Sequence, residues 1–265
     1  MKNRLLLPAL LFLCFGNVQG QEWKFLDSFV LKAPVHRASA DYYKNLYITD
    51  EHGNLYKHDS LGKLQITYSP PKSSKVSLID AWRGINIFLF YENFQEYVVL
   101  DRFLGQTQPL SLPRERVGFA RVATFALDNN LWVFDDIDFS LKKFNTQFDK
   151  IDFNTPLDLI LDASEYEITY MREYQNQLFI ADKNSGILVF DNLGNYKTKL
   201  PFVNVSWFSF WDDEIYFAQG DEFVRYNLYT FKEQRFPLPV KTRFIMLYDH
   251  KAFFIHQKYI KVYTF

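Results

Sequence analysis

The stretch Asn45–Gly62 reads NLYITDEHGNLYKHDSLG, and the architecture can be inferred from it. Each of its two β-rich runs ends at turn-forming Asp and Gly residues, which predicts a strand, a tight turn, a returning strand and a second turn. The same phrase recurs at Gln177–Gly194 as QLFIADKNSGILVFDNLG. Two matching hairpins so far apart in the chain indicate an internal repeat.

The second strand of this repeat can be aligned along the whole chain. Its six copies begin at Leu46, Ile87, Leu131, Leu178, Ile215 and Ala252, with spacings of 41, 44, 47, 37 and 37 residues. A period near 40 residues with four short strands per unit is typical of a β-propeller. We therefore predict an all-β protein, a six-bladed β-propeller with four-stranded blades, in which residues 21–265 form a single domain. Five or seven blades remain alternatives if a degenerate unit is misread.

The two ends of the chain are expected to meet in one blade. The last unit, from Thr242 to Phe265, supplies only three strands, whereas Glu22–Leu31 is a strand-like segment without a unit of its own. Pairing Phe25–Val30 with Lys258–Thr264 would complete the sixth blade and cover an open sheet edge. We therefore predict that an N-terminal strand closes the last blade. An outer-membrane β-barrel is the rival fold, but its strands need about 10 residues each.

The phrase Asn-Leu-Tyr-x-x-Asp-x-x-Gly-x-Leu-Tyr-x-x-Asp-x-x-Gly of Asn45–Gly62 carries a family resemblance. It resembles exported six-bladed β-propellers related to the NHL and TolB-like groups, in the style of Bacteroidota envelope proteins. The phrase is clear in units one and four and degenerate elsewhere. The resemblance implies a propeller across nearly the whole mature chain and implies no particular activity.

Residues 1–20 have the pattern of a secretory signal peptide. Lys2 and Arg4 precede an apolar run from Leu5 to Phe15, and Val18-Gln19-Gly20 suits cleavage before Gln21. The run is too short to span a membrane. An uncleaved anchor and lipidation at Cys14 are the alternatives. Because Cys14 is the only cysteine, the mature chain would be free of disulfides. We expect an exported protein in the periplasm or at the cell surface of a Gram-negative bacterium.

Charge and motifs narrow the class of function. The net charge of −1 gives no basic footprint of the kind that nucleic-acid binding requires. No Gly-x-Ser-x-Gly elbow and no phosphate loop is present. The five histidines are expected to be surface or turn residues, and the acidic cluster Asp135-Asp136-Ile137-Asp138 a solvated turn rather than a calcium loop. We predict no catalytic residue, no metal site and no cofactor.

Two regions are candidates for partner binding. The segment Asn154–Ser164 should form the longest crossing between units, with Leu157, Leu159 and Ile160 in an amphipathic run. Capping of a gap between blades is the alternative for this run. Basic and aromatic residues at the starts of inner strands could line one tunnel entrance; these are Arg37, Arg121, Tyr166, Trp207 and Arg243. Blade packing is the alternative role for Trp207.

The sequence therefore favours a non-enzymatic exported propeller. We expect it to act as a protein-interaction scaffold whose partner is another envelope protein, in an envelope or outer-membrane-associated complex. It would have no transmembrane span of its own and would associate with the membrane only peripherally, through the partner. The alternatives are a small-molecule propeller enzyme of the lactonase or lyase type and a glycan-binding module, the latter suggested by the 17 tyrosines and 5 tryptophans.

Overall fold

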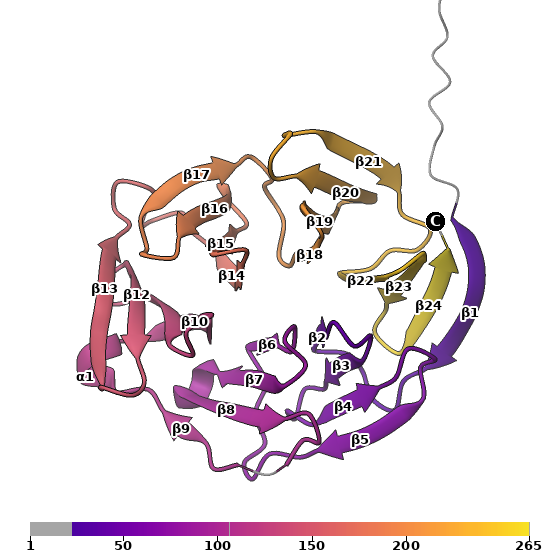
Figure 1. The fold of residues 1–265 in the computed structure, drawn as a ribbon, viewed down its shortest axis with the longest axis horizontal. Helices are drawn as coiled ribbons and strands as arrows, with labels where there is room; N and C mark the ends of the chain where they lie inside the picture. Colours follow the sequence, from indigo (N-terminus) through magenta and orange to yellow (C-terminus); the bar gives the residue numbers. More distant parts are fainter. Residues whose placement is uncertain (1–22, 106, 265) are drawn as a thin grey trace, which may run out of the picture.

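The protein is a ring of six antiparallel sheets, each of four strands, arranged as blades around a central axis (Figure 1). The computed structural model describes residues 23–105 and 107–264, so the predicted signal peptide, residues 1–20, lies outside the described residues. The predicted all-β six-bladed β-propeller is confirmed. None of the helices in the described ranges has the length and apolar character that a membrane crossing needs.

The first three blades are continuous in sequence, with the inner strand first. Blade one consists of β2 (Arg37–Ala40), β3 (Leu46–Thr49), β4 (Leu55–His58) and β5 (Leu64–Tyr68). Blade two consists of β6 (Leu78–Asp80), β7 (Asn86–Tyr91), β8 (Glu96–Asp101) and β9 (Leu110–Ser111), with the 3₁₀ turn η1 (Glu92–Phe94) between β7 and β8. Blade three follows the short helix α1 (Arg114–Val117) and consists of β10 (Ala120–Phe125), β11 (Leu131–Asp135), β12 (Ser140–Asn145) and β13 (Lys150–Pro156).

The last three blades repeat this order. Blade four consists of β14 (Ile168–Tyr174), β15 (Gln177–Asp182), β16 (Gly186–Asp191) and β17 (Tyr196–Leu200). Blade five consists of β18 (Ser209–Trp211), β19 (Glu214–Gln219), β20 (Glu222–Asn227) and β21 (Glu233–Pro237). Blade six consists of β22 (Phe244–Tyr248), β23 (Lys251–Ile255), β24 (Tyr259–Thr264) and β1 (Lys24–Val30).

The recurring Asp and Asn residues at the ends of third strands build turns. In five blades this side chain accepts a hydrogen bond from the backbone N–H two residues further on; the acceptors are Asp59, Asp101, Asn145, Asp191 and Asn227. A local side-chain acceptor of this kind stabilises the turn without any tertiary contact. The repeat signal in the sequence is therefore a signal for turns.

The ring is closed by β1, as the sequence predicts. It pairs antiparallel with β24, with Phe25 opposite Tyr263 and Val30 opposite Tyr259. The edge of blade six is thereby covered by the other end of the chain (Figure 1). The ring of Trp23 lies 5.0 Å from that of Phe254, and its indole N–H donates to a blade-five carbonyl.

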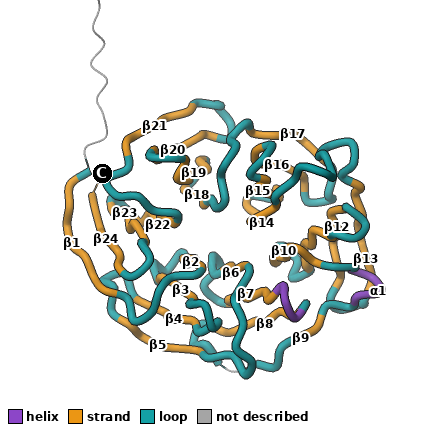
Figure 2. Tube along the Cα trace, turned by 180° about the vertical axis from the view of Figure 1, so that it is seen from behind, coloured by secondary structure: helices purple, strands orange, loops and turns teal. Residues whose placement is uncertain are grey.

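The core lies between the blades and is rich in aromatic side chains packed among aliphatic ones. Phe88 and Phe125 have ring centroids 4.8 Å apart and join blades two and three. The indole of Trp132 donates a 2.5 Å hydrogen bond to Glu173 Oε2 and joins blades three and four. The six inner strands surround the axis, and Figure 2 shows the same ring from behind. Their two ends thus form two separate surfaces at the centre of the ring.

Candidate functional site

The starts of the inner strands surround one opening of the central tunnel. Adjoining cavities of about 540 and 410 Å³ share Arg37, Glu167 and Thr169 in their walls. Side chains of both charges line them together with four aromatic residues, Tyr166, Tyr170, Trp207 and Phe244. We call this surface the charged mouth, and it comprises Arg37, Glu92, Arg121, Asp136, Tyr166, Glu167, Lys183, Trp207 and Arg243. The five residues expected at a tunnel entrance are among them.

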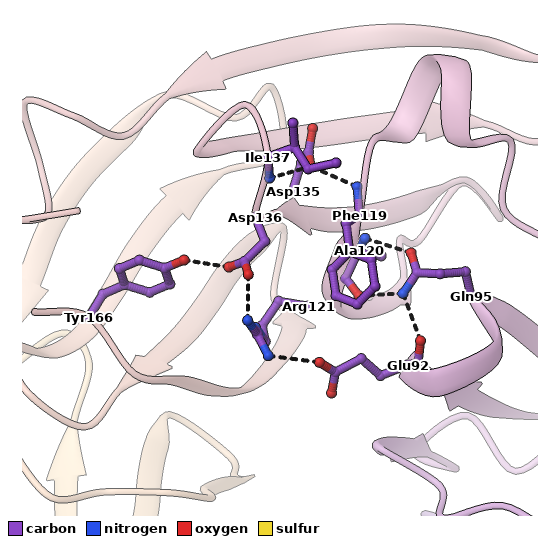
Figure 3. A network of polar contacts seen from close by, with 9 residues as sticks. All are labelled: Glu92, Gln95, Phe119, Ala120, Arg121, Asp135, Asp136, Ile137 and Tyr166. Atoms are coloured by element: carbon purple, nitrogen blue, oxygen red, sulfur yellow. Dashed lines mark hydrogen bonds and ion pairs between the residues drawn. The ribbon is translucent and has the colours of Figure 1, made fainter. Parts of the chain in front are cut away.

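A network of hydrogen bonds holds one side of the charged mouth (Figure 3). Arg121 Nη1 donates to Glu92 Oε1 at 2.9 Å, and its Nη2 forms an ion pair with Asp136. The other oxygen of Asp136 accepts from the hydroxyl of Tyr166. Burial and then Asp136 raise the pKa of Tyr166 to about 12, so this hydroxyl is a proton donor at neutral pH. The network links η1, β10, the β11–β12 turn and the entry to β14 (Figure 3).

Asp135 stabilises the turn that carries Asp136 through its own hydrogen bonds. The expectation that this acidic cluster is a solvated turn is wrong for Asp135, whose exposed fraction is 0%. Its Oδ1 accepts backbone hydrogen bonds from Phe119 and Ile137, both at 2.9 Å. Its Oδ2 accepts from the ammonium of Lys142 at 2.6 Å. A carboxylate that satisfies three donors can be buried at the end of a strand, and a solvated turn would not fix Asp136 in this way.

Arg37 and Arg243 form the part of the charged mouth with an excess of positive charge. Within the described residues neither side chain forms an ion pair with a carboxylate; both donate to the backbone carbonyl of His36. Burial, followed by the nearby charge of Arg243, lowers the pKa of Arg37 to about 10. The two guanidinium groups therefore repel each other, and an anionic group placed between them would relieve that repulsion.

The segment before Tyr166 runs beside the charged mouth, and its three candidate side chains lie in different environments. Leu157 is 0% exposed and belongs to the core, so its side chain is not available to a partner. Ile160 is half-buried against the same core. Leu159 is 95% exposed. The reason is a helical turn, in which Ile160 and Leu161 donate to the carbonyl of Leu157 and turn Leu159 outward. This segment caps the core and presents one apolar side chain.

Trp207 contributes little exposed surface to the charged mouth. It is 3% exposed, and its ring lies 5.6 Å from that of Phe244 in the next blade. Blade packing, the alternative considered for this residue, therefore accounts for its position. Its edge still lines the smaller cavity beside Arg243.

The titratable groups outside this network do not converge. Glu165 and Glu167 are both exposed, and Glu167 forms an ion pair with Lys183. His58 is buried in blade one, whereas His36 contacts Glu51 at 3.1 Å on the rim. Residues 23–105 and 107–264 contain no group of three or more His, Cys, Asp or Glu side chains that could hold a metal ion.

Four residues of the charged mouth lie outside the set expected at the tunnel entrance: Glu92, Asp136, Glu167 and Lys183. Gln95, beside Glu92, was not expected either. Gln95 bridges blades two and three, since its amide oxygen accepts from the Ala120 N–H at 2.7 Å and its amide nitrogen donates to the Ala120 carbonyl at 2.9 Å. Except for Glu167, which precedes β14, these residues stand in the connection between the second and third strands of a blade. The sequence could have indicated these residues. In every blade the connection between the second and third strands lies at the same end as the start of the inner strand.

Comparison with known proteins bears on the fold. No family model matches the chain, and no curated protein matches it. Among solved structures, a streptogramin B lyase is 16% identical with a TM-score of 0.61, covering 90% of this chain and 86% of the other. BamB from Moraxella catarrhalis is 11% identical with a TM-score of 0.52, covering 92% of this chain and all of the other.

A third similar structure is the extracellular domain of the putative one component system BT4673 from B. thetaiotaomicron. It is 10% identical with a TM-score of 0.58, and the match covers 87% of this chain and 33% of the other. At such identities the likeness concerns the fold alone. The similar folds range from a lyase to BamB. The chain is a six-bladed β-propeller whose structural neighbours include BamB-like propellers, as the resemblance in the sequence implies.

Proposed function

We propose that this protein is an exported, non-enzymatic β-propeller that binds another envelope protein through its charged mouth. The observation that carries the proposal is the convergence of Arg37 and Arg243, which lack a carboxylate partner within the described residues. Arginine is favoured in interface hot spots and binds carboxylates through two parallel hydrogen bonds. The partner is therefore expected to insert an acidic segment between these two side chains.

The surroundings of the two arginines support a protein partner. The Arg121–Asp136–Tyr166 network fixes one wall of the charged mouth, so that part of the surface is preorganised for binding. Leu159 stands 95% exposed in the segment that leads to Tyr166. An apolar side chain beside a charged centre suits the mixed composition of protein interfaces. We assign the complex to the bacterial envelope because of the predicted signal peptide.

The test is a cross-linked pull-down of the tagged, full-length protein from its native envelope, with Arg243→Glu and Leu159→Asp as variants. Arg102→Glu is the matched control, because Arg102 is exposed in the turn that follows β8, away from the charged mouth. We expect a stoichiometric partner whose recovery falls at least tenfold in both variants and stays unchanged in the control. Recovery should also fall with salt, because the contact is ionic.

Equal recovery of the partner with all three variants would refute the assignment of the charged mouth. Metal analysis of the same sample addresses the enzyme alternative. One bound divalent ion per chain, in the absence of any partner, would favour a small-molecule propeller enzyme. A glycan array probed with the same preparation addresses the glycan-binding alternative.

A further inference from the structure

The ends of the inner strands surround a second pocket, at the opposite end of the tunnel from the charged mouth. Its volume is about 330 Å³, at the lower end of the range for small-molecule sites. We call it the aromatic mouth, and its walls include Tyr42, Trp82, Tyr174, Phe210, Trp211 and Tyr248. These side chains come from every blade except blade three. A ligand in this pocket therefore meets aromatic rings on several sides.

Contacts between blades hold these rings in place. The rings of Tyr174 and Phe210 stack with centroids 4.2 Å apart and planes 4° from parallel. The ring of Trp82 lies 5.7 Å from that of Tyr174. At the rim, Tyr42 is 59% exposed, and its backbone N–H donates to the carbonyl of Trp82 at 3.2 Å. Aromatic side chains that are fixed before binding lose little conformational entropy when a ligand packs against them.

A second exposed tyrosine extends the aromatic surface beyond the pocket. The ring centroids of Tyr42 and Tyr43 are 4.1 Å apart, and both side chains are exposed. A Cβ at Gly84 would lie 2.6 Å from the ring of Tyr43, so the missing side chain lets this ring lie against blade two. The aromatic surface thus continues from the pocket onto the rim. Such a surface suits a ligand made of several ring-shaped units.

The accessible polar groups of the aromatic mouth are mainly hydrogen-bond acceptors. The exposed carboxylate of Asp212 forms no ion pair or hydrogen bond within residues 23–105 and 107–264. Asp249 Oδ2 accepts from the ammonium of Lys44 at 2.5 Å, which leaves Oδ1 for a ligand. The hydroxyl of Tyr174 donates to the carbonyl of Asp212 at 2.8 Å, so its oxygen can only accept. The ligand must therefore supply donors, as hydroxyl groups do.

The charges around the pocket favour a neutral ligand. Asp212 and Asp249 at the rim disfavour an anion. A cation meets Lys44 in the wall of the pocket. It also meets the buried guanidinium of Arg172, whose carbon lies 4.8 Å from the ring centroid of Trp82. Because Arg172 already makes the cation–π contact with that ring, a second cation there would be repelled.

We propose that the aromatic mouth binds a neutral oligosaccharide. One sugar ring packs its apolar face against the aromatic walls, and its hydroxyls donate to the carboxylates of Asp212 and Asp249. A further sugar ring packs against Tyr43 at the rim. The site lies at the opposite end of the tunnel from the charged mouth, so it goes beyond the proposed function and does not depend on it.

The test is isothermal titration of the purified protein with four neutral trisaccharides: maltotriose, cellotriose, mannotriose and triacetylchitotriose. We expect at least one of them to bind with a stoichiometry of one. Tryptophan fluorescence should change on binding, because Trp82 and Trp211 line the pocket. Trigalacturonate and tetramethylammonium test the charge of the ligand. Each should bind at least tenfold more weakly than the tightest neutral sugar.

Two exposed side chains allow the site to be tested with little effect on the core. Tyr42→Ala should weaken binding of the tightest sugar at least tenfold, because a wall of the pocket is lost. Asp212→Asn should weaken it at least fivefold, because the amide keeps the shape but accepts weaker hydrogen bonds than a carboxylate. Tyr196→Ala and Asp213→Asn are the matched controls, since both residues are exposed and lie outside the pocket. Both controls should bind the sugar as the wild type does.

Three results would overturn the proposal. One is the failure of all four trisaccharides to bind at millimolar concentration. Another is binding of tetramethylammonium or trigalacturonate within tenfold of the tightest neutral sugar, which would indicate a site for a charged ligand. The third is wild-type affinity in both Tyr42→Ala and Asp212→Asn, which would place the bound sugar elsewhere on the protein.

Discussion

Replacement of Lys142 by methionine should destabilise the protein through a single buried carboxylate. The ammonium of Lys142 lies 2.6 Å from Asp135 Oδ2, and its side chain is 5% exposed while that of Asp135 is 0% exposed. Methionine has a similar length and no charge. The substitution therefore leaves the Asp135 carboxylate without its counter-ion while the packing around it changes little.

The size of the effect follows from what Asp135 loses and what it keeps. Removal of one partner of a buried ion pair costs about 3–5 kcal/mol. Asp135 retains its backbone hydrogen bonds from Phe119 and Ile137, and hydrogen bonds to charged groups contribute about 1.5–3 kcal/mol each. We therefore expect the lower end of the range, about 3 kcal/mol. For a domain of this size this corresponds to a decrease in Tm of roughly 6–12 °C.

The assay is urea unfolding followed by tryptophan fluorescence, with the double variant Asp135→Asn/Lys142→Met completing a cycle. Asparagine still accepts the two backbone hydrogen bonds but carries no charge, so the double variant should recover part of the loss. We expect a coupling energy above about 1.5 kcal/mol, since residues in direct contact couple by about 0.5–3 kcal/mol. Asp138→Ala is the control and should change stability little, because Asp138 is exposed.

Two results would refute this reasoning. One is a loss below about 1 kcal/mol for Lys142→Met, which would mean that Asp135 does not need its counter-ion. The other is strict additivity of the two single substitutions, which would mean that the pair is not coupled. The substitution should also weaken partner recovery, because the same turn positions Asp136 against Arg121.

Three further predictions concern the ring and its titration. Deletion of β1 should expose the edge of β24 and cause aggregation, measured by size-exclusion chromatography; an intact monomer would contradict the closure argument. Gly62→Ala should cost more stability than Gly220→Ala in urea unfolding, because both glycines have positive φ but a Cβ at Gly62 would lie 2.4 Å from Phe29 of β1 while nothing lies within 4 Å at Gly220; equal losses would show that the contact is unimportant. Burial lowers the pKa of His58 below its ordinary 6.5, so the folded state binds a proton less readily than the unfolded chain and stability should fall as pH decreases through 6.5 and below. His58→Phe should lose less stability than the wild type between pH 7.5 and 5; identical pH profiles would assign the effect to other groups.

The turn chemistry made the blades predictable. The six second strands begin within one residue of the positions expected from the aligned phrases, from Leu46 in β3 to Ala252 in β23. Their turns depend on Asp, Asn and Gly side chains that act within a few residues of themselves, as the contact of Asp59 with the N–H of Leu61 shows. The closure by β1 followed because one strand was left over at the N-terminus and the last unit lacked its fourth strand. Local chemistry and a count of strands were sufficient for the architecture.

The candidate sites were less accessible from the sequence. Arg37, Arg121 and Arg243 were expected at one entrance because each stands at the start of an inner strand. Both carboxylate partners of Arg121 come from connections elsewhere in the chain. Glu92 reaches it through the packing of blade two on blade three, and Asp136 through the pairing of β10 with β11. Leu157 and Leu159 are two residues apart, yet a single helical turn buries one and exposes the other.

Arg172 also illustrates the difference between what the sequence predicts and what the packing of the blades determines. Its sequence context, Tyr170 to Tyr174, indicates a strand and nothing more. Its burial involves Trp82 of blade two, which is not a neighbouring blade, and Ser209 of the adjacent blade five. The repeat and its closure can be inferred from the chain alone because they arise from short-range turn chemistry. The charged mouth required the folded ring, because its residues are distant in sequence and meet only where the blades converge.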